Sequence, residues 1–104
     1  MVRVGIMKHC IIVKFKNTVS AEDKQRMLPD IAELFEQTRQ IEGVHNIRLL
    51  TNCTPRDNRY DLMIEMDMEQ SALTEYDDCV WHHRWKNEYG ELIEKKAIFD
   101  YEEA

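Results

Sequence analysis

The sequence predicts an α+β domain in which strands and helical regions follow one another in the order β-α-β-β-α-β. Three observations lead to this prediction. The chain has 104 residues, the length of one domain, so residues 1–104 are assigned to a single domain. Stretches in which apolar and polar residues alternate are separated by stretches in which apolar residues recur every three or four positions. The chain also has only three glycines and two prolines, which favours short connections.

The first strand is predicted over residues 9–16, with the sequence HCIIVKFK. These residues alternate between two faces, as they do in a strand that is buried on one side. One face is expected to pack against the helices, and it carries His9, Ile11, Val13 and Phe15.

The first helix is predicted to begin after Ser20, because serine caps helix N-termini well. Apolar residues then recur at spacings of 3, 4 and 7 as far as Ile41, which is the pattern of an amphipathic helix. Pro29 lies within this pattern and is expected to kink or divide the helix. Gly43 is expected to close it.

Two more strands are predicted next, over residues 44–51 and over residues 60–68, which alternate cleanly. A polar turn separates them. Their order after the helix fits the split β-α-β unit, in which the first and third strands lie side by side and antiparallel.

The last third of the chain completes the pattern. A short helix is predicted over residues 69–78 and a second helical segment over residues 82–95, interrupted near Gly90. Residues 96–101 (KAIFDY) are predicted as the closing strand. The whole is the ferredoxin-like topology, with a four-stranded antiparallel sheet.

In this topology the helices cover one face of the sheet and leave the other open. Lys14 and Lys16 are expected to share the open face with Glu65 and Asp67 and to pair with them across the strands. Because a bare sheet with much apolar surface usually has a partner, we expect a homodimer through this face. The apolar residues of the open face are Cys10, Ile12, Met63, Phe99 and Tyr101.

The composition argues against several classes of partner. The net charge of −6, from 20 acidic and 14 basic residues, disfavours nucleic acid and anionic membranes. The apolar run at residues 10–13 is far shorter than the roughly 20 residues that cross a bilayer. The three cysteines, Cys10, Cys53 and Cys79, lack metal-site spacing. They are expected to be free thiols in the cytoplasm, with no metal bound.

A histidine and an aspartate in the last third of the chain are candidates for general acid–base chemistry. Asp100 alternates with Ile98 onto the helix-facing side of the last strand, where a carboxylate needs a partner. A buried histidine would be a suitable partner, and the predicted pair is His82 with Asp100. Tyr76 is the candidate proton donor to a carbonyl group. His9 is expected to be a histidine at the core edge that makes one hydrogen bond.

These residues resemble the stress-responsive dimeric A/B barrel (Dabb) family. The resemblance spans the chain from Lys8 onward, and its most specific parts are residues 8–16 (KHCIIVKFK) and the block from Tyr76 to Tyr101. It implies a ferredoxin-like monomer whose sheet packs face to face with that of a second copy into a dimeric α+β barrel. This implication agrees with the homodimer expected from the open face.

One plant member of that family, olivetolic acid cyclase, closes a polyketide chain by aldol condensation without metal or cofactor. Tyr76 and His82 match its catalytic tyrosine and histidine with the same spacing, and Asp100 matches an aspartate near that histidine. The resemblance therefore implies an enzyme without a cofactor. The positions that would match pocket residues are His9, Ile11, Val13, Ile64, Trp85 and Ile98.

The chain departs from the family pattern beside the candidate histidine. Where the family usually reads His-Pro-x-His, this chain has CVWH at residues 79–82. Trp81 and Trp85 are bulkier than the residues of the cyclase and would shrink the cavity. The substrate of the cyclase is therefore not carried over to this chain.

Three hypotheses about function remain open at this point. The first is a cofactor-free lyase or cyclase that acts on a small apolar carbonyl compound through His82, Asp100 and Tyr76. The second is a non-catalytic or stress-associated dimeric module that binds a small apolar molecule in the same pocket. The third is a haem- or quinone-handling monooxygenase, in which a histidine such as His45 or His83 supplies an axial ligand.

Overall fold

The computed structural model describes residues 6–102 and confirms the predicted order of strands and helical regions. The strands are β1 (Ile6–Phe15), β2 (Val44–Thr51), β3 (Leu62–Glu69) and β4 (Ile93–Tyr101). The helices are α1 (Ala21–Glu36), α2 (Leu73–Asp78) and α3 (Val80–Tyr89). Short 3₁₀ turns at Gln37–Gln40, Gln70–Ala72 and Gly90–Leu92 follow α1, precede α2 and follow α3.

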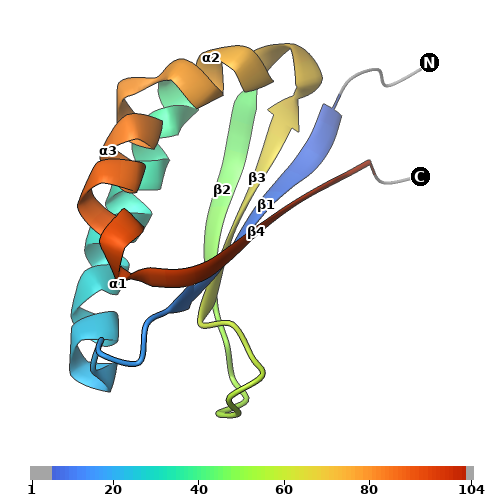
Figure 1. Ribbon diagram of the computed structural model, residues 1–104. Coiled ribbons are helices and arrows are strands. Elements are labelled where there is room, and N and C mark those ends of the chain that lie inside the picture. The colour runs from blue at the N-terminus through green and yellow to red at the C-terminus, as the bar shows by residue number, and fades with distance from the viewer. Residues whose placement is uncertain (1–5, 103–104) are drawn as a thin grey trace.

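The four strands form one sheet in the order β2-β3-β1-β4, and each neighbouring pair is antiparallel. This is the ferredoxin-like α+β topology that the sequence predicts. Figure 1 shows the helices together on one side of the sheet, while no helix covers the other side. The uncovered side is the open face.

The core lies between the sheet and the helices. The helix-facing residues of β1 and β3, such as Ile11, Val13 and Ile64, are at most 1% exposed. They belong to one cluster with the buried aromatic residues of α1 and α3. The Trp85 ring lies 5.0 Å from the Phe35 ring and 5.4 Å from the Tyr89 ring, between centroids. The contact between Trp85 and Phe35 packs α3 against α1.

Helix α1 begins as predicted but is not divided by its proline. Ser20 Oγ accepts a hydrogen bond from the Asp23 backbone N–H at 3.1 Å, which caps the helix. Pro29 lies inside the unbroken helix. Proline has no backbone N–H, so one carbonyl of the preceding turn loses its hydrogen-bond partner. The Pro29 side chain is exposed, so this carbonyl lies on the solvent side of the helix, where water can reach it. The helix ends at Glu36, seven residues before Gly43.

Gly43 stands at a turn where a side chain does not fit. Its φ of +95° favours glycine, and an added Cβ would lie 2.7 Å from Glu69 Oε2 and 3.3 Å from Ala72 Cβ. We therefore expect Gly43→Ala to lower the free energy of unfolding by about 1–3 kcal/mol, as measured by urea denaturation. Gly90→Ala is the matched control, because its φ is −54° and nothing lies within 4 Å of an added Cβ. Equal losses in the two variants would contradict this reading.

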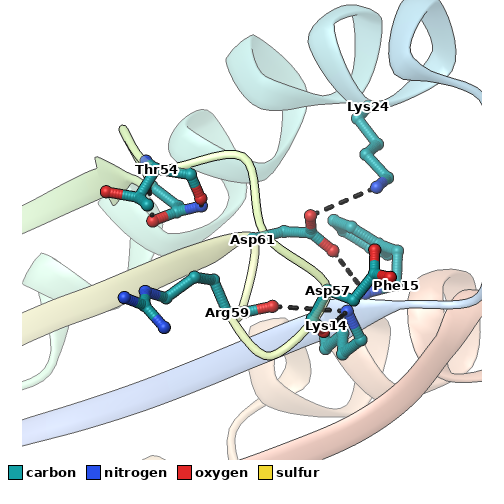
Figure 2. A network of polar contacts seen from close by, with 8 residues as sticks. Lys14, Phe15, Lys24, Thr54, Asp57, Arg59 and Asp61 are labelled. Atoms are coloured by element: carbon teal, nitrogen blue, oxygen red, sulfur yellow. Dashed lines mark hydrogen bonds and ion pairs between the residues drawn. The ribbon is translucent and has the colours of Figure 1, made fainter.

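Polar contacts fasten the β2–β3 connection to the end of β1 (Figure 2). The Lys14 ammonium donates to the backbone carbonyl oxygens of Asp57 and Arg59, at 3.0 and 3.3 Å. The Asp61 carboxylate accepts from the Phe15 backbone N–H at 2.7 Å, and its second oxygen accepts from the Lys24 ammonium at 3.1 Å. These bonds tie the loop to both the sheet and α1.

The predicted pairing of Lys14 and Lys16 with Glu65 and Asp67 is wrong. Antiparallel pairing places the start of β1 beside the end of β3, so that Lys8 lies opposite Asp67. The Lys8 ammonium is 2.6 Å from Asp67 Oδ1. Glu65 instead pairs with Arg48 of the neighbouring strand β2.

Candidate functional site

Three aromatic side chains from three elements meet at one end of the fold. Tyr76 of α2 contacts the imidazole rings of both His9 of β1 and His82 of α3. The ring centroids are 5.2 Å apart for His9 and Tyr76, and 5.0 Å apart for Tyr76 and His82. The structure therefore brings together two predicted catalytic residues, Tyr76 and His82, and one predicted pocket residue, His9.

The Tyr76 hydroxyl is a buried polar group without a partner. Its residue is 1% exposed, and no hydrogen-bond partner for the hydroxyl exists within residues 6–102. Burial, and next the charge of Cys79, raise the pKa of Tyr76 well above its ordinary value, so the phenol keeps its proton. An unsatisfied buried hydroxyl costs free energy, which a bound carbonyl group could offset by accepting its hydrogen bond.

His82 is held in one orientation by the short turn between α2 and α3. Cys79 caps α3, and its Sγ accepts the His82 backbone N–H at 3.3 Å. The His82 Nδ1 lies 3.0 Å from the backbone carbonyl oxygen of Asp77. A carbonyl oxygen can only accept, so Nδ1 carries the hydrogen in this bond. In the neutral ring the lone pair is therefore on Nε2, where it can accept a proton.

Burial also keeps His82 neutral. Burial lowers the pKa of His82 below its ordinary value of 6.5, and the hydrogen bond to the Asp77 carbonyl opposes this shift only in part. At pH 7 the ring is then mostly unprotonated. A neutral imidazole with a fixed tautomer is what a general base requires.

Asp100 pairs with His9, and the prediction that it pairs with His82 is wrong. The His9 Nδ1 and Asp100 Oδ1 atoms are 2.5 Å apart. The two residues are direct partners in the register between β1 and β4, whereas His82 lies on a helix. His9 is 4% exposed and makes the single hydrogen bond that its position suggested. Because the carboxylate accepts, the Nδ1 of His9 carries a hydrogen and its Nε2 is left for another partner.

The other predicted pocket residues occupy two environments. Ile11, Val13, Ile64 and Trp85 are buried in the core between sheet and helices. Ile98 pairs with Ile11 in the register but is 51% exposed, because β4 is an edge strand. Their role in binding a ligand stays a prediction.

The open face carries apolar surface, as the sequence suggests. Phe99 is 60% exposed, and its ring lies 5.9 Å from the ring of Tyr101. Ile12 and Met63 are half-buried beside them in the sheet. Cys10 on the same face is buried, and burial, followed by the charge of Glu65, raises the pKa of its thiol. All three cysteines are free thiols.

The described part of the chain carries neither a cluster of metal ligands nor a membrane-spanning helix. Within residues 6–102, no three His, Cys, Asp or Glu side chains are grouped closely enough to hold a metal ion. In that same part of the chain, no helix combines the length and the apolar character needed to span a bilayer.

Comparison with known proteins identifies similar families and structures. The model of the stress responsive A/B barrel domain (Dabb) matches residues 7–103. No curated protein matches the chain. Among solved structures, a Dabb family protein with a ferredoxin-like fold from Mesorhizobium loti is 22% identical, with a TM-score of 0.76 over 96% of this chain and 98% of that chain.

Two further solved structures share the fold. A dimeric protein of unknown function from Bacteroides fragilis is 20% identical, with a TM-score of 0.79 over 95% of this chain and 97% of that one. The hydroxynitrile lyase from Passiflora edulis is 14% identical, with a TM-score of 0.73 over 95% and 94% of the two chains. At these identities the likeness shows the fold alone.

Proposed function

Because the chain belongs to the stress-responsive A/B barrel family, we propose that it is a homodimeric acid–base catalyst that acts on a small apolar carbonyl compound without a cofactor, as a lyase or cyclase. One observation carries this proposal. The buried hydroxyl of Tyr76 has no partner within residues 6–102, and the Tyr76 ring contacts that of His82, whose neutral form has its Nε2 lone pair available. A hydrogen-bond donor for an oxyanion and a base for a proton are the two groups that enolate chemistry needs.

The proposed reaction begins at the carbon next to the substrate carbonyl. His82 Nε2 takes a proton from that carbon and becomes an imidazolium. The electron pair of the broken C–H bond moves into the carbonyl group and forms an enolate. The Tyr76 hydroxyl donates a hydrogen bond to the enolate oxygen. In a cyclase the enolate carbon then attacks a second carbonyl of the same molecule, whose oxygen receives the proton back from the imidazolium.

His9 and Asp100 act in this proposal as positioning residues. The bond between His9 Nδ1 and Asp100 Oδ1 fixes the His9 ring, which packs edge-on against Tyr76 with an angle of 70° between the planes. This ring contact helps to hold the phenol of Tyr76 in place. The apolar residues of the core around these rings would exclude water from the enolate.

The homodimer is proposed to form through the open face. Phe99, the most exposed large apolar residue of the structure's described part, lies on that face, where no helix covers the sheet (Figure 1). Burying such a surface against a second copy is favourable by roughly 25 cal/mol per Å² of apolar area. The similar protein from Bacteroides fragilis is described as dimeric, which supports the same arrangement here.

Deuterium exchange into a simple ketone tests the catalytic proposal. With acetophenone in D₂O, the protein is expected to exchange the methyl protons roughly 10²-fold faster than free imidazole at equal concentration, as followed by ¹H NMR. Exchange requires only proton abstraction and return, so it does not depend on knowing the natural substrate. Binding of acetophenone without any exchange above that of heat-unfolded protein would contradict the proposal and favour the non-catalytic binding module.

A further inference from the structure

Two lysines lie on the same faces of α3 and β4 as residues of the proposed site. Lys86 follows His82 by four residues in α3, so the two side chains are neighbours on one face of the helix. In β4, Lys96 and Asp100 alternate onto one side of the strand. Lys96 lies opposite the core residue Val13, so this is the side that faces the helices. One cation thus comes from the helix and one from the strand.

The connection between α3 and β4 brings the two lysines to one end of the site. The 3₁₀ turn Gly90–Leu92 joins the two elements, which diverge from it (Figure 1). Lys86 lies four residues before this turn and Lys96 four residues after it. His82 and Asp100 lie farther from the turn on their elements. The site therefore has a lysine end, formed by Lys86 and Lys96, and a catalytic end beyond it.

Both lysine charges reach the catalytic end and are free to meet a ligand. Burial is the main cause that lowers the pKa of His82, and the charges of Lys86 and Lys96 lower it further. Because the Coulomb interaction weakens with distance, both ammonium groups lie near this ring. Within residues 6–102 neither lysine forms a hydrogen bond or an ion pair with another residue.

The negative charges of the site lie at the catalytic end. Asp77 follows Tyr76 near the end of α2, and its backbone carbonyl holds the His82 ring. The Asp100 carboxylate pairs with His9. A ligand with a single negative charge is therefore attracted to the lysine end and repelled from the catalytic end. This polarity would leave an uncharged carbonyl group of the same ligand for the Tyr76 hydroxyl.

An apolar side chain separates the two ends along β4. Ile98 lies between Lys96 and Asp100 on the helix-facing side of the strand, opposite the core residue Ile11. It is 51% exposed, although its register partner is buried. Covering this side chain with the hydrocarbon part of a ligand removes apolar surface from water, which is favourable.

We propose that the substrate of this site is a carbonyl compound that also carries a carboxylate, with the carboxylate at Lys86 and Lys96 and the hydrocarbon part along Ile98. The inference rests on the proposed function, because it places the carbonyl group at the Tyr76 hydroxyl, which is buried and has no partner in the described part of the chain. The lysines would donate charge-assisted hydrogen bonds to the carboxylate. One helical turn, about 5.4 Å, separates Lys86 from His82 along α3, so an apolar spacer fits between the two polar groups.

Titration with 4-acetylbenzoate tests this inference, and 4-acetylbenzamide serves as the neutral ligand of the same shape. In ¹H–¹⁵N NMR spectra the acid is expected to bind about tenfold more tightly than the amide and to shift resonances of α3 and β4 most. Its affinity should fall as salt is raised, because exposed charges are screened. Deuterium exchange of the methyl protons should show the same preference once each rate is divided by the rate with free imidazole, which corrects for the acidity of the ketone.

Matched variants decide whether the two lysines are responsible. Lys86→Gln combined with Lys96→Gln is expected to abolish the preference for the acid and to leave the affinity for the amide within about twofold. Lys95→Gln combined with Arg56→Gln changes the net charge equally and should keep the preference. Lys95 points to the other side of β4, and Arg56 lies in the β2–β3 connection. All four residues are exposed, so the fold is retained.

The outcomes separate this inference from the proposed reaction. Equal binding of acid and amide, a preference that persists in the double lysine variant, or shifts centred elsewhere would each overturn the inference, even if acetophenone is exchanged. A preference for the acid that depends on Lys86 and Lys96, without exchange of any ketone, would support the carboxylate site and contradict the reaction.

Discussion

The His82→Gln variant is expected to lose at least about 100-fold of the acetophenone exchange rate while the protein stays folded. Glutamine has a similar size and can still donate an N–H to the Asp77 carbonyl, but its amide does not accept a proton near neutral pH. His82 is half-buried in the first turn of α3, so the substitution creates no large cavity. The rate is measured by ¹H NMR, and the fold by circular dichroism and thermal melting.

His83→Gln is the matched control for this variant. His83 is the next residue in α3, is exposed, and has its ring centroid 6.5 Å from that of His82. Its replacement should leave the exchange rate within about twofold of the wild-type rate. If the exchange rate falls equally in both variants, or does not fall in His82→Gln, then His82 is not the base. Unfolding of His82→Gln alone would make this histidine structural.

The Phe99→Glu variant is expected to separate the homodimer. Phe99 is 60% exposed on the open face, so the monomer tolerates the change, but a dimer through this face would bury a charge. A penalty of about 3 kcal/mol or more raises the dissociation constant at least 100-fold, at about 1.4 kcal/mol for each factor of ten. Sedimentation equilibrium over a range of protein concentrations measures this shift.

Val80→Glu controls for the general effect of a new surface charge. Val80 is 59% exposed, nearly the same as Phe99, but it lies at the start of α3 on the helical side of the sheet. Its replacement should leave the dissociation constant unchanged. A dimer that survives Phe99→Glu, or a protein that is monomeric before any substitution, would contradict the proposed interface.

The strands and helices were predictable because their patterns are local. The second strand has the predicted bounds, since its alternation is delimited by Gly43 and by a polar turn. β1 begins three residues earlier than predicted and β4 begins at Ile93, because strand ends depend on which residues find a partner across the sheet. Pro29 was harder to place, since its effect depends on whether water reaches the carbonyl that it leaves unpaired.

The partner of Asp100 was not predictable in the same way. Alternation along β4 gives the face on which Asp100 lies, but only the register with β1 decides that it meets His9. That register includes an irregularity between Lys14 and Phe15, which the sequence pattern does not predict. The prediction was correct in one respect, because this carboxylate does pair with a histidine.

Two features of the site give no sequence signal. The unpartnered hydroxyl of Tyr76 follows from the packing of α2 on the sheet, and the orientation of His82 follows from the turn that Cys79 caps. Cysteine is an uncommon residue for a helix cap, so the pattern that marks Ser20 as a cap would not single it out. The spacing of Tyr76 and His82 placed them in one region, and the ring contact follows from the three-dimensional packing.

The measurement that tests the central claim most directly is the pH dependence of the ketone exchange rate. A neutral His82 is required, and burial lowers its pKa, so the rate should be constant above pH 7 and fall only through a midpoint below 6.5. Tyr76 should cause no decrease in the exchange rate up to about pH 10, because burial raises its pKa and the phenol keeps its proton. The acidic limb should disappear in His82→Gln. A rate that rises in proportion to hydroxide over the whole range, equally in both proteins, would contradict catalysis at this site.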